Sequence, residues 1–221
     1  MEVYFGKLFY DQILLYFIIV KNIFNVIFKI SNIIRSTKDM FTIVASNKDT
    51  KEDIINEIIK IENEVYEESM RGDYKSIKAR FYKYPEMFFL AYIENKIVGY
   101  FCFFPISQKL YEDIVCKKEF RDSDIIPEDI VPFEETSHIY ALSIAILKNY
   151  QNLGIGKALM DNFENFIGNK KLEGYDIEDI IATVVSKDGE KCAIKNGFEL
   201  CHDVWDEKGY KIYIKRIPKL Q

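Results

Sequence analysis

The sequence predicts an α/β (α+β) protein in which helices flank a mixed, mostly antiparallel twisted sheet. Three observations favour this class. Short apolar, β-branched runs alternate with helical patterns from residue 40 onward. Two of these runs, 88–93 and 96–104, are joined by Glu94 and Asn95 alone, which is typical of a hairpin. A third run, 139–147, leads through a glycine-containing loop into an amphipathic helix.

The first half of the chain predicts two helices between its first strands. A short strand is expected at 41–45. Asp49 and Thr50 can then cap a helix running to about Tyr66, because apolar residues recur on one helical face (Ile54, Ile58, Ile61, Val65). A second helix is expected at 74–84 and stops at Pro85. The two hairpin strands follow it.

The second half begins with a long polar insertion, 107–137, for which a short helix near Tyr111 is expected. After the strand at 139–147 comes a helix with one apolar face (Ile155, Leu159, Phe163, Phe166, Ile167). A strand at 179–185 and a helix at 186–196, stopped by Gly197, come next. A closing pair of strands is expected at 198–205 and 210–217, around Glu207-Lys208-Gly209.

Two domains are expected: residues 1–39, a hydrophobic and basic helical extension, and a main domain, 40–221. The longest apolar run of the extension, Ile13–Val20, has eight residues, whereas a membrane span needs about 20. No small-residue cleavage site follows it, as it would in a signal peptide. Three interpretations stay open: a membrane-interface helix, a helical hairpin covering the main domain, or a translated extension ahead of Met40.

The composition narrows the function classes. Hydrophobic residues make up 48% and charged residues 29%, which predicts a folded protein with a sizeable core. The net charge of −5 argues against a nucleic-acid-binding face. Four cysteines without a Cys-x-x-Cys pair, and only two histidines, predict no metal site. Because the cysteine spacing suggests no disulfide framework, we expect a cytoplasmic protein, with peripheral membrane contact through residues 1–39 left open.

The loop between 147 and 155 has the character of an anion site. The first N–H groups of a helix lack internal partners and carry partial positive charge, and glycines allow close approach. Gln151, Gly154 and Gly156 stand at this position. A Walker loop is not indicated, because Gly156-Lys157 is followed by alanine. A dinucleotide loop would need a third glycine. The plainer interpretation is a turn that only joins strand to helix.

The spacing Gln151-x-x-Gly154-x-Gly156 resembles the signature of the GNAT superfamily of N-acetyltransferases, whose loop holds the pyrophosphate of acetyl-CoA. The segment 195–199, Lys-Asn-Gly-Phe-Glu, resembles a second motif of that family. The resemblance covers about 180 of 221 residues and implies a GNAT-like sheet. It also implies an acyltransferase that moves the acetyl group of acetyl-CoA, as cosubstrate, to a primary amine by direct attack in a ternary complex.

The resemblance also implies site residues. Backbone groups of the fourth strand would hold the pantetheine arm and the acetyl oxygen (Ile144, Ala145, Ile146), and the loop would hold the pyrophosphate (Gln151, Asn152, Leu153, Gly154, Ile155, Gly156, Lys157). The family's usual base position is Tyr140, with His138 and Glu135 as further candidates. The family's usual acid, a tyrosine, is Ala193 here. Either the thiolate leaves without help from the protein, or another residue such as Tyr175 or Tyr210 substitutes.

The insertion 107–137 is the clue to the acceptor, since it holds nine acids against four bases. An acidic rim would attract a cationic amine, such as a polyamine, an aminoglycoside or a basic peptide. The alternative is an ordinary solvated loop.

Two rival functions stay open. One is a non-catalytic acyl-CoA-binding module, suggested by Ala193 and by the lack of an obvious base at Tyr140. The other is a membrane-associated interaction protein that depends on residues 1–39. A homodimer is implied by the resemblance alone.

Overall fold

The computed structural model describes residues 40–50, 53–116, 125–203 and 210–219. The expected extension, 1–39, and the expected turn at 207–209 lie outside the described residues. Within the described part of the chain, no helix is long and apolar enough to cross a membrane.

Among the described residues, seven strands form one sheet in the order β1-β2-β3-β4-β5-β7-β6. The strands are β1 (Thr42–Ala45), β2 (Phe88–Ile93), β3 (Lys96–Ile106), β4 (His138–Ile146), β5 (Asp179–Val184), β6 (Glu199–Asp203) and β7 (Lys211–Arg216). From β2 to β6, every neighbouring pair is antiparallel except β4 with β5. The prediction of a mixed, mostly antiparallel sheet flanked by helices is therefore confirmed.

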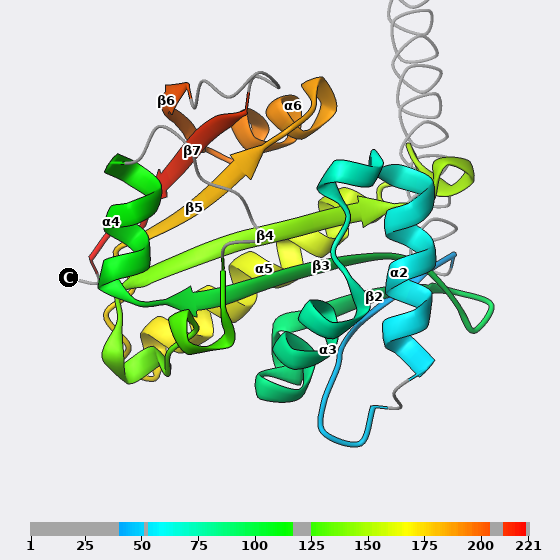
Figure 1. Cartoon of the computed structure of the whole chain (residues 1–221), viewed down its shortest axis with the longest axis horizontal. Helices are drawn as coiled ribbons and strands as arrows, with labels where there is room; N and C mark the ends of the chain where they lie inside the picture. The colour runs from blue at the N-terminus through cyan, green and yellow to red at the C-terminus, as the bar shows by residue number, and fades with distance from the viewer. Residues whose placement is uncertain (1–39, 51–52, 117–124, 204–209, 220–221) are drawn as a thin grey trace, which may run out of the picture. The chain divides into compact units, whose positions relative to one another are not determined.

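The helices lie on both faces of this sheet. They are α2 (Asp53–Val65), α3 (Tyr74–Lys83), α4 (Gln108–Cys116), α5 (Ile155–Leu172) and α6 (Lys187–Lys195). Figure 1 shows α2, α3 and α4 in front of the sheet and α5 behind it. The helix α2 contacts both β3 and β4, and α5 contacts β2, β3 and β4. The strands β3 and β4 are thus covered on both faces.

Aromatic side chains fill the space between the sheet and α5. The rings of Phe101 and Phe103 lie 4.9 and 4.6 Å from the ring of Phe163 on α5. Phe89 of β2 lies 5.2 Å from Phe103. Edge-on and tilted contacts at these separations are favourable for aromatic pairs, in addition to the burial of their apolar area. This cluster fixes α5, and with it the loop that precedes α5, against β3 and β4.

Local sequence signals set most element ends. Glu94 and Asn95 have φ values of 47° and 67°, as a two-residue hairpin turn requires. Gly197, which follows α6, has φ 79°. The short helix expected near Tyr111 is confirmed as α4, which runs over nine residues and buries Leu110 and Ile114. The hydroxyl of Ser107 accepts a hydrogen bond from the Leu110 N–H at the start of α4.

Candidate active site

The sheet opens between its two parallel strands. Pairing of β4 with β5 starts at His138 with Asp179 and ends at Ala141 with Ala182. From there β4 continues to Ile146, paired with β3, whereas β5 continues along β7. Figure 1 shows the two strands diverging toward their carboxyl ends. Residues 142–146 of β4 therefore border an opening on the side that β5 has left.

The backbone of Ile144 and Ile146 faces this opening. The Leu147 N–H donates to the Val98 carbonyl of β3 at 2.9 Å. Because backbone groups alternate in direction along a strand, those of Ile144 and Ile146 point away from β3, and those of Ala145 point toward it. The carbonyl of Ile144 accepts a hydrogen bond from the Tyr66 hydroxyl at 2.9 Å, and that of Ile146 from the Gln151 amide at 3.0 Å.

The predicted loop lies at the mouth of this opening. Asn152 and Gly154 have φ values of 62° and 86°, and α5 begins immediately afterwards at Ile155. The Ala158 N–H donates to the Gly154 carbonyl at 3.0 Å. Helix geometry leaves the preceding N–H groups, those of Ile155, Gly156 and Lys157, without an acceptor inside the helix. Together with the helix dipole, these groups favour an anion.

Two glycines allow this part of the chain to pack closely. A Cβ built on Gly99 of β3 would lie 2.9 Å from the Ala145 carbonyl oxygen, which is a backbone atom of β4. A Cβ built on Gly156 would lie 3.3 Å from Cδ1 of Ile146. The end of β4 is thus held tightly between β3 and the first turn of α5.

The side chains of the loop have separate roles. Ile155 is buried and anchors the first turn of α5 in the core. Leu153 is half-buried, and Gln151 and Asn152 are exposed. The Lys157 ammonium pairs with Asp161 at 2.5 Å on the exposed surface of α5. Since exposed pairs of this kind contribute about 0.3–0.5 kcal/mol, little holds Lys157 in this position.

Tyr140, at the family's usual base position, lies deep in the sheet. Its side chain is fully buried, and its hydroxyl is 2.6 Å from the Thr183 hydroxyl of β5. Four residues separate Tyr140 from Ile144, which is about 13 Å along a strand.

His138 belongs to a row of charged and polar groups across three strands. Its Nδ1 lies 2.9 Å from the Asp179 carboxylate of β5, which also pairs with Arg216 of β7 at 2.6 Å. Its Nε2 lies 2.8 Å from the Gln108 side chain of α4, and the Tyr111 ring stacks on the imidazole at 3.7 Å. The imidazole is buried with both nitrogens engaged, about 20 Å along β4 from Ile144.

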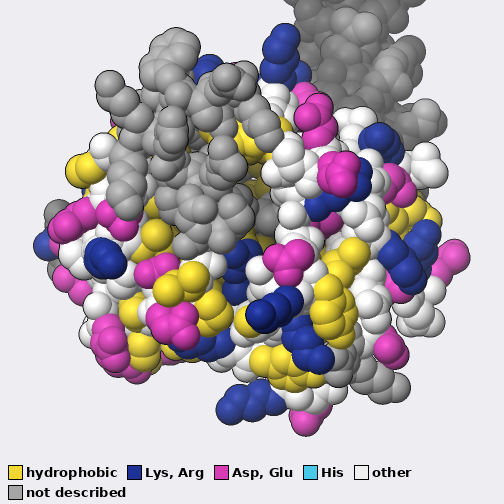
Figure 2. Space-filling model, in the orientation of Figure 1, with side chains coloured by type: hydrophobic (Ala, Val, Ile, Leu, Met, Phe, Trp, Pro, Cys, Tyr) yellow, Lys and Arg dark blue, Asp and Glu magenta, His cyan; other side chains and the backbone are white. Residues whose placement is uncertain are grey.

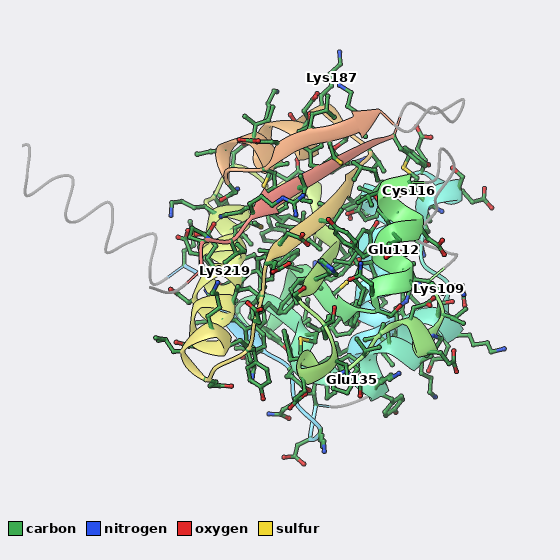
Figure 3. The ribbon with its side chains drawn as sticks, turned by 90° about the vertical axis from the view of Figure 1, so that its left-hand side faces the viewer. Lys109, Glu112, Cys116, Glu135, Lys187 and Lys219 are labelled. Carbon is green, nitrogen blue, oxygen red and sulfur yellow. The ribbon has the colours of Figure 1, made fainter. Side chains whose placement is uncertain are left out.

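Glu135 lies at the opposite end of β4 from the loop. It lines a hollow of about 600 Å³ together with Phe133 and Tyr175. Figure 3 looks onto the end of the sheet where β4 begins, and Glu135 is seen there, below α4. The Tyr175 hydroxyl donates to Glu134 at 3.2 Å at the same end. Ala193 is buried on α6.

Beside Ile144 the structure reveals a polar network that the sequence did not predict. The Tyr66 hydroxyl lies 3.1 Å from the Ser143 hydroxyl, which lies 2.8 Å from the Tyr100 hydroxyl. Tyr100 in turn donates to the carboxylate of Glu62. The second carboxylate oxygen of Glu62 accepts from the Gly72 N–H. Glu62 is only 6% exposed, so this is a buried carboxylate next to the opening.

A sequence signal for Glu62 existed. The residue lies seven positions after Ile55 and four after Ile58, and those two side chains are fully buried. At 3.6 residues per turn these positions share a face, so Glu62 is an acid on the apolar stripe of α2. The other members of the network, Tyr100 and Ser143, lie on β3 and β4, and the sequence does not predict the register between these two strands.

Charges on the described surface are mixed. On the face shown in Figure 2, the coloured Lys and Arg side chains are interspersed with those of Asp and Glu. The expected acidic rim includes residues 117–124, which lie outside the described residues. Within the described ranges, no three His, Cys, Asp or Glu side chains are grouped so that they could hold a metal ion.

The match to a family model defines the class of this protein as an acyltransferase that uses an acyl-CoA. The sequence matches the model of the acetyltransferase (GNAT) family over residues 52–178, which is more than half of the chain. The chain belongs to the acetyltransferase (GNAT) family. Members of this family are acyltransferases that depend on acetyl-CoA.

Solved structures share this fold at low identity. The loading GNATL domain of CurA from Lyngbya majuscula has a TM-score of 0.60 and 15% identity, covering 80% of this chain and 97% of that domain. Naa50 from Arabidopsis thaliana has a TM-score of 0.53 and 14% identity, covering 80% of this chain and 98% of Naa50. The ribosomal-protein-S18-alanine N-acetyltransferase from Escherichia coli has a TM-score of 0.53 and 13% identity, covering 82% of this chain and 97% of that enzyme. A search of curated protein sequences gave no match.

Proposed function

We propose that this protein is an N-acetyltransferase that moves the acetyl group of acetyl-CoA to a primary amine by direct attack in a ternary complex. The observation that carries the proposal is the opening between β4 and β5, onto which the backbone of Ile144 and Ile146 faces. The glycine loop and the first turn of α5 follow within ten residues. A long, narrow ligand with phosphates at one end fits this sequence of features.

The residues present suit acetyl-CoA. The N–H groups of Ile144 and Ile146 would hold the pantetheine arm and the acetyl oxygen, and those of residues 151–157 would hold the pyrophosphate. Ala145 would contribute through its position between them. When bound, acetyl-CoA supplies an activated thioester. The protein aligns the amine with that carbonyl, which is a large part of catalysis in such transfers.

The acceptor is proposed to be a cationic small molecule or a peptide amine. The acids of segment 107–137 support a cationic acceptor. The peptide alternative is supported by the relatives, because Naa50 was solved with the bisubstrate analogue CoA-Ac-MVNAL. Tyr140, His138 and Glu135 stay predictions for the base. Cytoplasmic location, a homodimer and membrane contact through residues 1–39 also stay predictions.

Turnover by the purified full-length protein tests this function. We would measure release of free thiol from acetyl-CoA with a panel of spermidine, kanamycin, hydrazine and short peptides with free N-termini. We expect at least one amine to give thiol release together with a product heavier by one acetyl group. Binding of acetyl-CoA without turnover on any amine would instead favour the non-catalytic module.

A further inference from the structure

A chain of hydroxyl groups leads from the opening into the protein. Tyr66 follows α2 directly, and its hydroxyl contacts both the Ile144 carbonyl and the Ser143 hydroxyl, at 2.9 and 3.1 Å. Ser143 lies 2.8 Å from Tyr100, and Tyr100 donates to Glu62. Each consecutive pair is within hydrogen-bond distance. The chain therefore joins the part of β4 that borders the opening to one buried carboxylate.

The surroundings of Glu62 suit a group that takes up a proton. Burial raises the pKa of its carboxyl above the ordinary value of 4.5. The hydrogen bonds from Tyr100 and Gly72, and the positive charges of Arg80 on α3 and of Arg71, act in the opposite direction and favour the charged form. Burial also raises the pKa of Tyr100 well above 10, so Tyr100 stays protonated and can donate. A carboxyl group whose pKa is raised by burial takes up a proton more readily than an exposed carboxyl group does.

We propose that Glu62 is the final acceptor of the proton that the attacking amine loses, and that the proton travels along Tyr66, Ser143 and Tyr100. This inference rests on the proposed acetyl transfer. Tyr66 is the member of the chain that would touch the amine. Glu62 and Tyr100 act through Tyr66 and Ser143, and they are therefore positioning residues.

The transfer balances in protons and electrons. An ammonium substrate gives one proton to the Tyr66 oxygen, and the Tyr66 O–H turns from the Ile144 carbonyl to the Ser143 oxygen and passes its own proton on. Ser143 passes its proton to Tyr100, and Tyr100 passes its proton to Glu62, which becomes a neutral acid. The free amine then attacks the thioester carbonyl, and the C–S bond breaks. The second amine proton goes to the leaving thiolate, so CoA leaves as a thiol and no redox change occurs.

Two of the other candidate bases, His138 and Glu135, lie toward the far end of β4 from the opening. The imidazole of His138 has both nitrogens engaged and lies about 20 Å along β4 from Ile144. Glu135 lies at the same distant end of the strand. Glu62, in contrast, is joined to Ile144 by consecutive hydrogen bonds through Tyr100, Ser143 and Tyr66.

The test compares Glu62→Gln with wild type over a pH series, using acetyl-CoA and spermidine or the best acceptor of the panel. Without a proton acceptor, only the free amine can react. We therefore expect kcat/KM of the variant to rise about tenfold per pH unit up to the pKa of the amine, while wild type stays nearly flat above the pKa of Glu62. The loss at pH 7 should be about 100-fold or more and should vanish near the amine pKa.

Two further variants separate this role from a structural one. Tyr100→Phe keeps the Glu62 carboxylate but interrupts the chain of hydroxyls. Its kcat/KM should therefore rise with pH as steeply as that of Glu62→Gln. The variant that carries both substitutions should have a kcat/KM no lower than either single variant. Glu57→Gln lies on the same helix, pairs with Lys60 at the surface and should behave as wild type. Acetyl-CoA affinity should be unchanged in all three variants.

The outcomes separate the two proposals. A loss in Glu62→Gln that is equal at every pH, or no loss, would overturn the role of Glu62 while leaving acetyl transfer in place. Absence of turnover by wild type with every amine would overturn acetyl transfer itself, and the role of Glu62 with it.

Discussion

The hydroxyl of Tyr66 lies 2.9 Å from the carbonyl oxygen of Ile144, although 78 residues separate the two in sequence. This contact joins the end of α2 to the strand that borders the opening of the sheet. At Ile144, β4 is no longer paired with β5, so its backbone carbonyl accepts a hydrogen bond from a side chain instead of from a strand.

Replacing Tyr66 by phenylalanine should impair the chemical step more than cofactor binding. The variant removes the hydroxyl from both Ile144 and Ser143 while retaining the ring. We expect kcat to fall at least about tenfold and the KM for acetyl-CoA to change little. Steady-state kinetics with acetyl-CoA varied at saturating amine would check this. An unchanged kcat with a raised KM would assign Tyr66 to binding instead.

A methyl group at Gly99 should destabilise the sheet beside the site. Its Cβ would lie 2.9 Å from a backbone oxygen of β4, which no side-chain rotation can relieve. We expect Gly99→Ala to lower the free energy of unfolding by about 1–3 kcal/mol. Gly168→Ala is the matched control, because Gly168 lies inside α5 with nothing within 4 Å of its Cβ position. That control should stabilise the protein by about 0.5–1 kcal/mol. Urea unfolding of both variants measures the two changes in the free energy of unfolding, and equal changes would contradict the prediction.

The stability of the protein should depend on pH through Glu62. Its pKa in the folded state is raised, so the folded protein binds this proton more tightly than the unfolded chain does. The stabilisation is therefore fully present below about pH 4.5 and is lost as the pH rises through the raised pKa. Relative to Glu62→Gln, wild type should become less stable between pH 4 and pH 8. Urea unfolding of both proteins across this range gives the difference, and a difference that grows in favour of wild type would contradict the sign.

His138→Gln should affect stability and leave the form of the pH–rate profile unchanged. The imidazole bridges Asp179 and Gln108 under the Tyr111 ring, and its loss leaves the buried Asp179 with fewer donors. We expect the free energy of unfolding to fall by about 1–3 kcal/mol. Calorimetry and a pH–rate series on the same variant would check both parts. A pH–rate profile that loses its acidic limb in this variant would instead support His138 as the base.

The sequence was informative where the structure is local. Helical spacing located α2 and α5, Pro85 and Gly197 marked helix ends, and Glu94-Asn95 marked the hairpin turn. The short helix expected near Tyr111 is α4, on which Leu110 and Ile114 stand four residues apart and are both buried.

The polar networks could not be predicted, because they depend on strand register. His138 meets Asp179 across 41 residues, and Glu62 meets Tyr100 across 38. A shift of one residue in either strand would move these side chains to the other face. Counting along the strand gave His138 and Tyr140 as candidate bases for the amine, but it did not show that α4 covers His138. It also did not show which acid of α2 points inward.

The most direct test of the account is thermal stabilisation of the full-length protein by acetyl-CoA, comparing wild type with Gly156→Glu. At 100 times its dissociation constant, a ligand adds about 2.7 kcal/mol to the wild type. Glutamate at 156 would put bulk and negative charge at the first turn of α5, where the phosphates are proposed to bind. Gly168→Glu, the same change on the exposed side of α5, serves as control. The account predicts a shift in wild type and in the control that disappears in Gly156→Glu. A shift that persists in Gly156→Glu, or no shift in wild type, would contradict it.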